Sequence, residues 1–384
     1  MSILLASTLK PCDDVRMYHK IACTLAEANP QELFYVLGFE AEVPIDKPKN
    51  IVFLPMFQFK RLAWKRLFAN WILFRNLLKI QPNMLIICTF ELLPASVLYK
   101  FFQYLKGKKI RLVYDIQENY FANVLYTNKH YPWGIQHVLA WAIRMVEWVC
   151  SFWINDYFLA ERCYESELKY LHKGNFLLLE NKVLPHFFQP LANNEIDKRN
   201  YHLALVGTIS ASYGLWQAIE FAEKLYSQIP TIRLYITGNC PVTQEYTELL
   251  ELSLQKKFLV LNVKNKPLPY SEIVRTMQKA SVILMPYKPQ RNILHRIPTK
   301  MFECLFLQKI MLIQQNDFWK KYLQQFDFKS AIFIDFYQTY HVQSIWQRLQ
   351  NELFYQSPNN NYSLFTWQKD KLLEWFDSQS SREY

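Results

Sequence analysis

Short apolar segments recur along this chain and alternate with longer stretches of helical pattern. Runs that are almost continuous in Val, Ile, Leu and Phe are typical of parallel strands covered by helices on both faces. Strands that alternate with helical patterns indicate βαβ units, so the sequence predicts an α/β fold. The thirteen predicted strands are Ile3–Ala6, Leu33–Leu37, Ile51–Leu54, Met84–Thr89, Ile110–Ile116, Ile154–Ala160, Phe176–Leu179, His202–Val206, Ile232–Thr237, Phe258–Leu261, Val282–Met285, Ile310–Ile313 and Ala331–Ile334.

The length of 384 residues fits two domains better than one. A polar stretch from Gln189 to Asn200 separates the first seven predicted strands from the last six. The second series restarts with a strand and a glycine turn, so we expect an N-terminal domain over 1–190 and a C-terminal domain over 201–384. Open α/β sheets bind ligands at the carboxyl ends of their strands, which predicts a site between the two domains.

Composition narrows the function classes. Glycine occurs only seven times, and neither the G-x-G-x-x-G nor the P-loop pattern is present. The seven cysteines are scattered without C-x-x-C spacing, which disfavours a zinc site and a disulfide framework and favours a reducing cytoplasm. The N-terminal MSILLAST reads as a core strand and not as a signal peptide. A net charge of +11 indicates an acidic partner or surface, but no motif or basic tail points to nucleic acid.

The stretch from Arg291 to Leu312 combines a basic loop, a helix that starts at a proline, and a carboxylate inside that helix. The free N–H groups of a first helical turn and its positive dipole end favour an anion. Guanidinium, imidazole and ammonium groups add donors suited to phosphate oxygens. A carboxylate one turn deeper is placed to accept hydrogen bonds from sugar hydroxyls, so this segment predicts a site for a nucleotide diphosphate. Its residues are Arg291, His295, Arg296, Pro298, Thr299, Lys300 and Glu303.

Four segments of the sequence resemble motifs of one family. The string RIPTKMFECLFLQKIMLI resembles the P-x-K-x-x-E helix of GT-B glycosyltransferases of the family-4 (glycosyl transferases group 1) type. Asp13 to Glu27 resembles the first helix of that family, Leu112 to Tyr120 resembles its YDxHE strand end, and LALVGTIS with Tyr213-Gly214 resembles the opening of its donor domain. The resemblance implies two Rossmann-like domains facing across a cleft, with a C-terminal helix, here Trp367 to Phe376, crossing back to the first domain.

The resemblance also implies donor contacts and shows departures from the family. Gly207 and Thr208 close the first strand of the second domain; Gly207 lets backbone approach a phosphate or simply makes a strand-to-helix turn. Thr208 and Tyr213 stand where the family often has Arg and Lys, and His295 replaces the first of two acids. The diphosphate charge would then fall to Arg291, Arg296 or Lys300. Glu303 is either the ribose-binding carboxylate or an ordinary exposed helix residue.

In the first domain, the candidate catalytic residues are Asp115, Gln117 and Glu118, at the end of a predicted strand. Gln117 takes the place of a family histidine and can bind a sugar hydroxyl, although it cannot act as a base. Asp115 or Glu118 would equally fit as a cap of the next segment. Arg16 would either reach the same cleft or form a surface pair with Asp13 or Asp14.

Two further segments bear on a membrane. Phe57 to Pro82 contains six basic residues and no acid. It is read as an amphipathic helix for an anionic membrane surface or as a Rossmann helix with a solvated basic face. The run Val138 to Ile154 is apolar, but it is short and interrupted by Arg144 and Glu147. It is a poor transmembrane candidate, so we expect a buried helix.

The resemblance implies a retaining hexosyltransferase that moves a sugar from a nucleotide diphosphate sugar to a glycan or a lipid-linked glycan in surface polysaccharide synthesis. No D-x-D occurs in the sequence, so the resemblance implies a metal-independent enzyme without a cofactor, located in the cytoplasm or at the inner face of the plasma membrane. Two alternatives stay open: a catalytically silent binding or scaffold protein of the same fold, and an enzyme such as a nucleotide-sugar epimerase that needs no acceptor.

Overall fold

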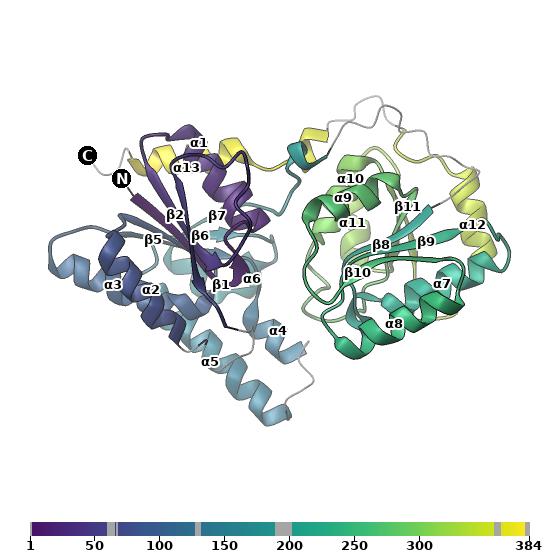
Figure 1. Cartoon of the computed structure of the whole chain (residues 1–384), viewed down its shortest axis with the longest axis horizontal. Helices are drawn as coiled ribbons and strands as arrows, with labels where there is room; N and C mark the ends of the chain where they lie inside the picture. Colours follow the sequence, from purple (N-terminus) through teal and green to yellow (C-terminus); the bar gives the residue numbers. More distant parts are fainter. Residues whose placement is uncertain are drawn as a thin grey trace. The chain divides into compact units, whose positions relative to one another are not determined.

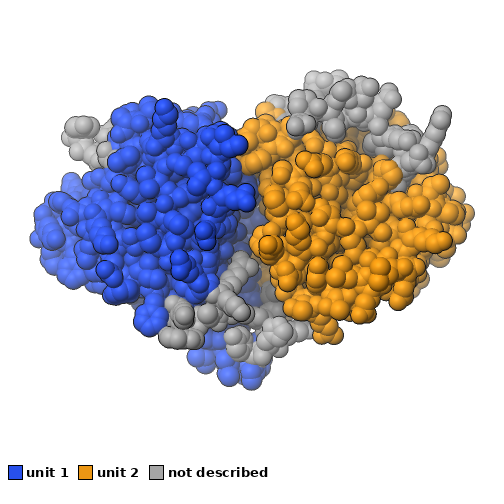
Figure 2. Space-filling view, viewed as in Figure 1, with its two compact units in different colours: residues 1–181, 367–384 blue, residues 182–366 orange. Residues whose placement is uncertain are grey.

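The computed structural model describes residues 2–59, 66, 68–126, 132–188, 202–356 and 362–380. The chain forms two compact units (Figure 2). Unit 1 comprises Met1–Asn181 and Trp367–Tyr384, and unit 2 comprises Lys182–Thr366. The first part of unit 1 therefore ends before the polar stretch 189–200 that marks the predicted linker. Unit 1 also includes the C-terminal segment from Trp367, which the prediction assigned to the domain 201–384.

Unit 1 is built on a seven-stranded parallel sheet in the order β3-β2-β1-β4-β5-β6-β7 (Figure 1). Residues such as Leu4, Leu85 and Leu112 are fully buried because helices cover both faces of the sheet. The order reverses between β1 and β4, which makes this pair the switch point of the sheet. The strands are β1 (Ser2–Pro11), β2 (Leu33–Phe39), β3 (Ile51–Phe57), β4 (Met84–Ile87), β5 (Arg111–Ile116), β6 (Asp156–Leu159) and β7 (Asn175–Leu178).

Three helices cover one face of this sheet: α2 (Ala69–Ile80), α3 (Leu93–Leu105) and α5 (Trp133–Ser151). A π-helix (Val15–Ala22) continues into α1 (Cys23–Ala28), against which the C-terminal α13 (Lys369–Ser380) packs (Figure 1). The Trp367 Nε1 donates to Thr24 Oγ1 at 3.2 Å, which fixes the returning segment to unit 1. The predicted return of the C-terminal helix to the first domain is thereby confirmed. Two short helices, α4 (Tyr120–Tyr126) and α6 (Tyr164–Glu167), follow strands β5 and β6.

Unit 2 has a six-stranded parallel sheet in the order β10-β9-β8-β11-β12-β13. Its helices form two layers, α7, α8 and α12 on one face and α9, α10 and α11 on the other. The strands are β8 (His202–Thr208), β9 (Arg233–Asn239), β10 (Leu259–Lys264), β11 (Val282–Met285), β12 (Ile310–Gln314) and β13 (Ala331–Ile334). The helices are α7 (Leu215–Tyr226), α8 (Thr243–Gln255), α9 (Tyr270–Lys279), α10 (Thr299–Leu307), α11 (Asp317–Leu323) and α12 (Val342–Asn351).

Each of the thirteen predicted strands overlaps an observed strand, so the predicted α/β fold with two parallel sheets is confirmed. The predicted basic helix over 57–82 is only partly described. Residues 60–65 and 67 lie outside the described residues, and the remainder forms the end of β3 and helix α2. On α2, Arg75 and Lys79 are exposed while Leu73 and Leu77 are buried against the sheet.

The prediction of a buried helix over Val138 to Ile154 is wrong. Helix α5 covers this run, but Val138, Trp141 and Met145 are each more than half exposed. The side of α5 that faces the sheet carries buried Ala140 and Cys150 together with the buried Glu147, which accepts a hydrogen bond from Tyr114 Oη at 3.0 Å. Among the described helices, none combines the length and the apolarity that crossing a bilayer demands.

Candidate functional site

The switch point of the unit 2 sheet lies between β8 and β11, where the strand order reverses. Parallel sheets of this kind bind ligands just outside the carboxyl ends of the strands at that point. Strand β8 ends with Gly207 and Thr208, and β11 is followed by the loop over 286–298 and then by α10. The segment predicted to bind a nucleotide therefore begins at the edge of the sheet that is expected to hold a ligand.

Helix α10 starts one residue later than the sequence suggests. Pro298 is the N-cap residue, with φ −58° and ψ 136°, and Thr299 is the first helical residue. Proline has no side-chain acceptor, and Pro298 makes no side-chain capping hydrogen bond. Within the first turn, the Met301 N–H donates to the Pro298 carbonyl oxygen at 2.8 Å, and the positive end of the helix dipole favours an anion at this end.

Glu303 is the buried centre of the site. Its side chain is 1% exposed, so the reading of Glu303 as an ordinary exposed helix residue is wrong. One carboxylate oxygen, Oε2, lies 2.6 Å from Lys300 Nζ, and Oε1 accepts a hydrogen bond of 2.6 Å from Tyr270 Oη. A buried carboxylate needs such partners, because an uncompensated charge in the interior is costly.

Tyr270 is a site residue that the sequence analysis missed. It opens helix α9, and its ring also lies 5.7 Å from Lys300 Nζ in a cation–π arrangement. Burial, together with the Glu303 carboxylate, raises the pKa of Tyr270 well above its ordinary value, so the phenol stays protonated and acts as a donor. Tyr270 carries no motif of its own, and only the tertiary fold brings it to Glu303.

Gly207 lies beside the Lys300 side chain. Its φ is +106°, and a Cβ placed on it would lie 3.2 Å from Cε of Lys300. The neighbouring strand β9 also lies very close, because a Cβ on Gly238 would lie only 1.8 Å from the Gly207 carbonyl oxygen. The missing side chain of Gly207 thus leaves room for the Lys300 stem, which packs the first turn of α10 against the end of β8.

The remaining predicted donor residues lie on the loop before α10, at the start of α10 and at the end of β8. Arg291 and His295 are exposed, and the His295 ring packs against Phe318 at 5.7 Å. The backbone oxygen of Arg296 accepts a hydrogen bond of 2.6 Å from Trp319 Nε1. Thr208 and Thr299 are exposed at the end of β8 and the start of α10. Contacts with α11 therefore hold this basic loop in place.

In unit 1, Asp115 forms a buried ion pair with Arg16. Arg16 Nη2 lies 2.6 Å from Asp115 Oδ1, and Arg16 Nε lies 3.0 Å from Asp115 Oδ2. Arg16 Nη1 donates to the Leu179 carbonyl at 2.7 Å and to Asn181 Oδ1 at 2.9 Å. The predicted surface pair of Arg16 with Asp13 or Asp14 is wrong, since Asp14 instead accepts from two backbone N–H groups at the start of the π-helix.

Gln117 and Glu118 extend this cluster at the end of β5. Gln117 Nε2 donates to Asp115 Oδ2 at 2.9 Å, while Glu118 Oε2 accepts from Asn123 Nδ2 at 2.8 Å. Both side chains are partly exposed, whereas Asp115 is fully buried. Asp115 therefore pairs with Arg16 and does not cap the next segment. Gln117 and Glu118 remain the two predicted residues here that a ligand could touch.

A polar cluster at the switch point of unit 1 was not predicted. Thr8, at the end region of β1, donates from Oγ1 to Glu91 Oε2 at 2.5 Å and lies 3.2 Å from Thr89 Oγ1. Arg66 Nη2 pairs with Glu91 Oε1 at 2.6 Å. In the sequence, Thr8 and Thr89 each lie just after an apolar run, and this is the feature that could have pointed to the cluster. This group lies where open sheets bind ligands and is suited to hydroxyl-bearing molecules.

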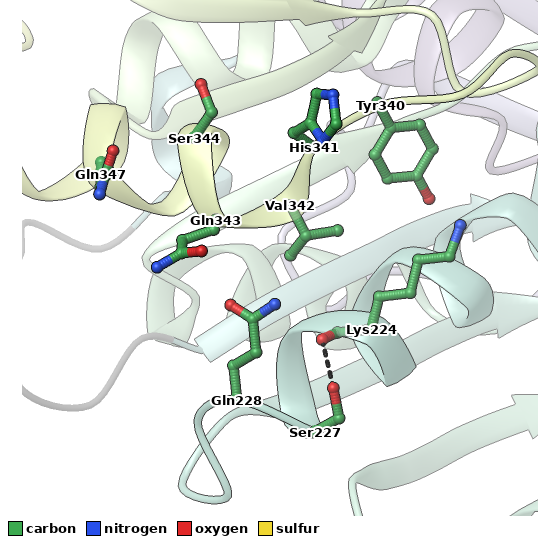
Figure 3. Close-up of a pocket in the computed structure, with 9 residues that line it drawn as sticks. All are labelled: Lys224, Ser227, Gln228, Tyr340, His341, Val342, Gln343, Ser344 and Gln347. Atoms are coloured by element: carbon green, nitrogen blue, oxygen red, sulfur yellow. Dashed lines mark hydrogen bonds between the residues drawn. The ribbon is translucent and has the colours of Figure 1, made fainter.

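A separate cavity of 620 Å³ lies between α7 and α12 (Figure 3). Its lining includes Lys224, Gln228, His341 and Gln343, and none of the predicted donor-site residues. Lys224 is already paired with Glu220 at 2.6 Å. The cavity is therefore not assigned to the donor site.

The arrangement in unit 2 is suited to an anion that also carries hydroxyl groups. It offers a positive helix end and an ammonium group held at a fixed position by a buried carboxylate. Across the described ranges, no three His, Cys, Asp or Glu side chains are grouped so that they could hold a metal ion.

Comparison with known proteins shows the fold. No protein-family model and no curated protein sequence matches this chain. Solved structures do match over almost the full length. Sucrose-phosphate synthase from Thermosynechococcus elongatus has 12% identity and a TM-score of 0.66, covering 100% of this chain and 98% of its own. HepE from Anabaena, solved with UDP and glucose, has 10% identity and a TM-score of 0.63 over 99% and 100% of the two chains. WaaG, described as a glycosyltransferase involved in lipopolysaccharide biosynthesis, has 12% identity and a TM-score of 0.60 over 98% and 95%. The chain therefore has the GT-B fold of two Rossmann-like units.

Proposed function

We propose that this protein is a GT-B glycosyltransferase that moves a hexosyl group from a nucleotide diphosphate sugar to a hydroxyl group of a glycan or lipid-linked glycan. The observation that carries the proposal is the group of Gly207, Lys300 and Glu303 at the switch point of unit 2. A helix start and a fixed ammonium meet there at the ligand-binding edge of the sheet. This combination fits a diphosphate better than it fits a neutral ligand.

The donor site works through charge that is already in position. The Lys300 ammonium and the first-turn N–H groups of α10 bind the diphosphate and stabilise the negative charge that grows on it as the sugar leaves. The Lys300 ammonium stays paired with Glu303 and uses its other N–H groups for the phosphate, while the remaining acceptor positions of the Glu303 carboxylate bind ribose hydroxyls. Thr299 and the loop residues Arg291 and Arg296 add further donors around the phosphates. Gln117 and Glu118 are proposed to lie near the reacting sugar.

Similar structures support a nucleotide-sugar donor and a role in surface polysaccharides. HepE was solved with UDP-glucose, and WaaG acts in lipopolysaccharide synthesis. By analogy we extend the family chemistry to this chain: retention of the anomeric configuration, no metal and no cofactor beyond the donor. All seven cysteines are free thiols in the structure. This agrees with a cytoplasmic enzyme, for which we propose a place at the inner face of the plasma membrane.

One alternative function has support from specific residues. Thr208 and Tyr213 replace the Arg and Lys that the family often places at the donor phosphates, and Gln117 replaces its histidine. A protein of this kind could bind a nucleotide or glycan without transferring a sugar. The two candidates differ in one measurable property, the release of nucleotide from a donor sugar.

The first test is calorimetric binding of UDP, GDP and ADP. We expect one of the three to bind with micromolar affinity and Lys300→Met to weaken that binding about 10- to 100-fold, because a charge-assisted hydrogen bond contributes about 1.5–3 kcal/mol. Methionine keeps the apolar stem that packs over Gly207. Lys320→Met, which changes an exposed lysine on α11, should bind like the wild type. Absence of binding by all three nucleotides would contradict the proposal.

The second test uses the nucleotide that binds. Its hexose donors are incubated with the protein, with and without a glycan or lipid-linked acceptor, and nucleotide release is measured. Release that depends on the acceptor supports the transferase. Tight binding without release favours the silent protein instead.

A further inference from the structure

The outward side of helix α5 is apolar along its whole length. Exposed Val138, Trp141, Met145, Trp148, Val149 and Phe152 recur at helical spacing and fall within about 100° of the helix circumference. Each of these side chains is 44–70% exposed. An isolated exposed apolar residue is ordinary, but a continuous row on one helix indicates an interaction surface.

The inward side of α5 carries small apolar residues, such as Ala140 and Cys150, together with polar ones. Glu147 and Ser151 are buried, and Arg144 pairs with Glu147 at 2.9 Å. The Glu147 carboxylate also accepts from Tyr114 of strand β5. Cys150 and Val146 on this side pack against the core of unit 1, so these positions, and not the exposed row, attach the helix to the sheet. Hydrophobic burial inside unit 1 does not explain the apolar row, so something outside unit 1 is expected to cover it.

Helix α3 packs against both α5 and α2 (Figure 1), and aromatic side chains continue the surface onto these two helices. Trp153, just beyond α5, packs edge to face on Phe101 with ring centroids 5.7 Å apart. Phe101 lies 6.2 Å from Phe102, which in turn lies 6.0 Å from Phe74 of α2. Trp71 on α2 is 58% exposed and carries the Arg75 guanidinium over its ring at 4.6 Å. Helices α2, α3 and α5 thus share one aromatic face, called here the α5 face.

The charges around the α5 face are of one sign. Within the described helices α2, α3 and α5 the only carboxylate is Glu147, which is buried. The exposed charged groups are cations, namely Arg75 and Lys79 on α2 and the three lysines that follow α3 at 106, 108 and 109. A protein partner of ordinary composition would not require this one-sided charge, whereas an anionic lipid surface matches it.

We propose that the α5 face is a docking surface for an anionic lipid bilayer. Tryptophan and phenylalanine rings enter the boundary between headgroups and acyl chains, as in helices that lie flat in a membrane surface, and the cations contact lipid phosphates. This places the main contact on α5 and α3, together with α2, which belongs to the basic segment 57–82. The proposal does not depend on the transferase activity, because it rests on side chains of unit 1 alone.

The test is co-sedimentation of the full-length protein with two kinds of vesicle. One contains phosphatidylcholine alone, and the other also contains roughly 30% phosphatidylglycerol, which makes its surface moderately anionic. We expect binding to the anionic vesicles only. Trp141→Gln with Trp148→Gln should reduce partitioning by about tenfold for each tryptophan. Arg75→Gln with Lys79→Gln should reduce it by about fivefold for each charge and lessen its dependence on salt.

Matched controls separate lipid docking from misfolding. Leu250→Gln with Leu254→Gln removes two exposed apolar residues from α8 of unit 2 and should leave partitioning unchanged. Thermal unfolding should agree among all variants. Equal binding to neutral vesicles would overturn the proposal. The proposal would also be overturned if the protein did not bind lipid and formed a dimer that became monomeric in the Trp141→Gln, Trp148→Gln variant. The α5 face would then be an interface between two copies of the chain. Neither result would bear on nucleotide binding.

Discussion

Lys300 Nζ and Glu303 Oε2 lie 2.6 Å apart on the first turns of α10, and both side chains are largely shielded from water. The residue expected to bind phosphate is thus held by the residue expected to bind ribose. A pair of this kind fixes the ammonium before a ligand arrives, so less side-chain entropy is lost on binding. It also means that substitution of either residue changes the folded protein as well as the site.

The first prediction concerns the stability of unit 2. Glu303→Ala removes the acceptor of both Lys300 and Tyr270 and should lower the free energy of unfolding by about 3 kcal/mol. Glu303→Gln keeps an acceptor for Tyr270 and should cost less. Urea unfolding without nucleotide measures both, with Glu248→Ala, an exposed residue of α8, as the control. A Glu303→Ala protein as stable as the control would show that the pair is not a structural unit.

The second prediction concerns Gly207. An alanine there must adopt a φ of +106° and bring its Cβ to 3.2 Å from Lys300 Cε. We expect Gly207→Ala to lose about 1–3 kcal/mol of stability and to weaken nucleotide binding by displacing Lys300. Gly134→Ala is a suitable control, because a Cβ at Gly134 meets nothing within 4 Å. Normal nucleotide affinity in Gly207→Ala would disprove the proposed support of Lys300 by β8.

Local patterns predicted the elements of this fold well. Buried parallel strands leave short apolar runs, and these depend on neighbouring residues in the sequence. The same holds for Lys300 and Glu303, which lie three residues apart on one helix. Tyr270 is 33 residues from Glu303, and Arg16 is 99 residues from Asp115, so no local pattern reveals either contact.

The wrong prediction for α5 has a related physical cause. Apolar composition over Val138 to Ile154 indicates only that these side chains favour a non-aqueous environment. It does not say whether the protein interior or another surface supplies that environment. Which side of α5 faces the sheet is seen from the burial of Ala140, Glu147 and Cys150, and the contact of Glu147 with Tyr114 becomes known only from the tertiary structure.

The third prediction separates structure from catalysis at Asp115. Asp115→Ala leaves the buried Arg16 guanidinium without its carboxylate and should cost about 3–5 kcal/mol of stability. Arg16→Lys should cost nearly as much, because lysine cannot reproduce donation to Asp115, Leu179 and Asn181 together. Gln117→Ala, at the partly exposed edge, should leave stability close to that of the wild type. Hydrogen exchange of β5 and the π-helix measures each effect; unchanged protection in Asp115→Ala would show that the buried pair does not stabilise unit 1.

The fourth prediction concerns pH and Glu147. Burial raises the pKa of Glu147 from its ordinary value of 4.5 to about 7, against the opposing effects of Arg144 and Tyr114. Between these two values the folded state holds the proton more tightly than the unfolded state, so stability falls as pH rises from about 4.5 to 7 and then levels off. The contribution is roughly 3 kcal/mol. Urea unfolding at pH 5, 6, 7 and 8 should show this slope in the wild type and a much flatter profile in Glu147→Gln. Glu374→Gln, on the exposed side of α13, should keep the slope. If Glu147→Gln keeps it too, another group is responsible for the pH dependence, and Glu147 is ionised in its pair with Arg144 throughout this range.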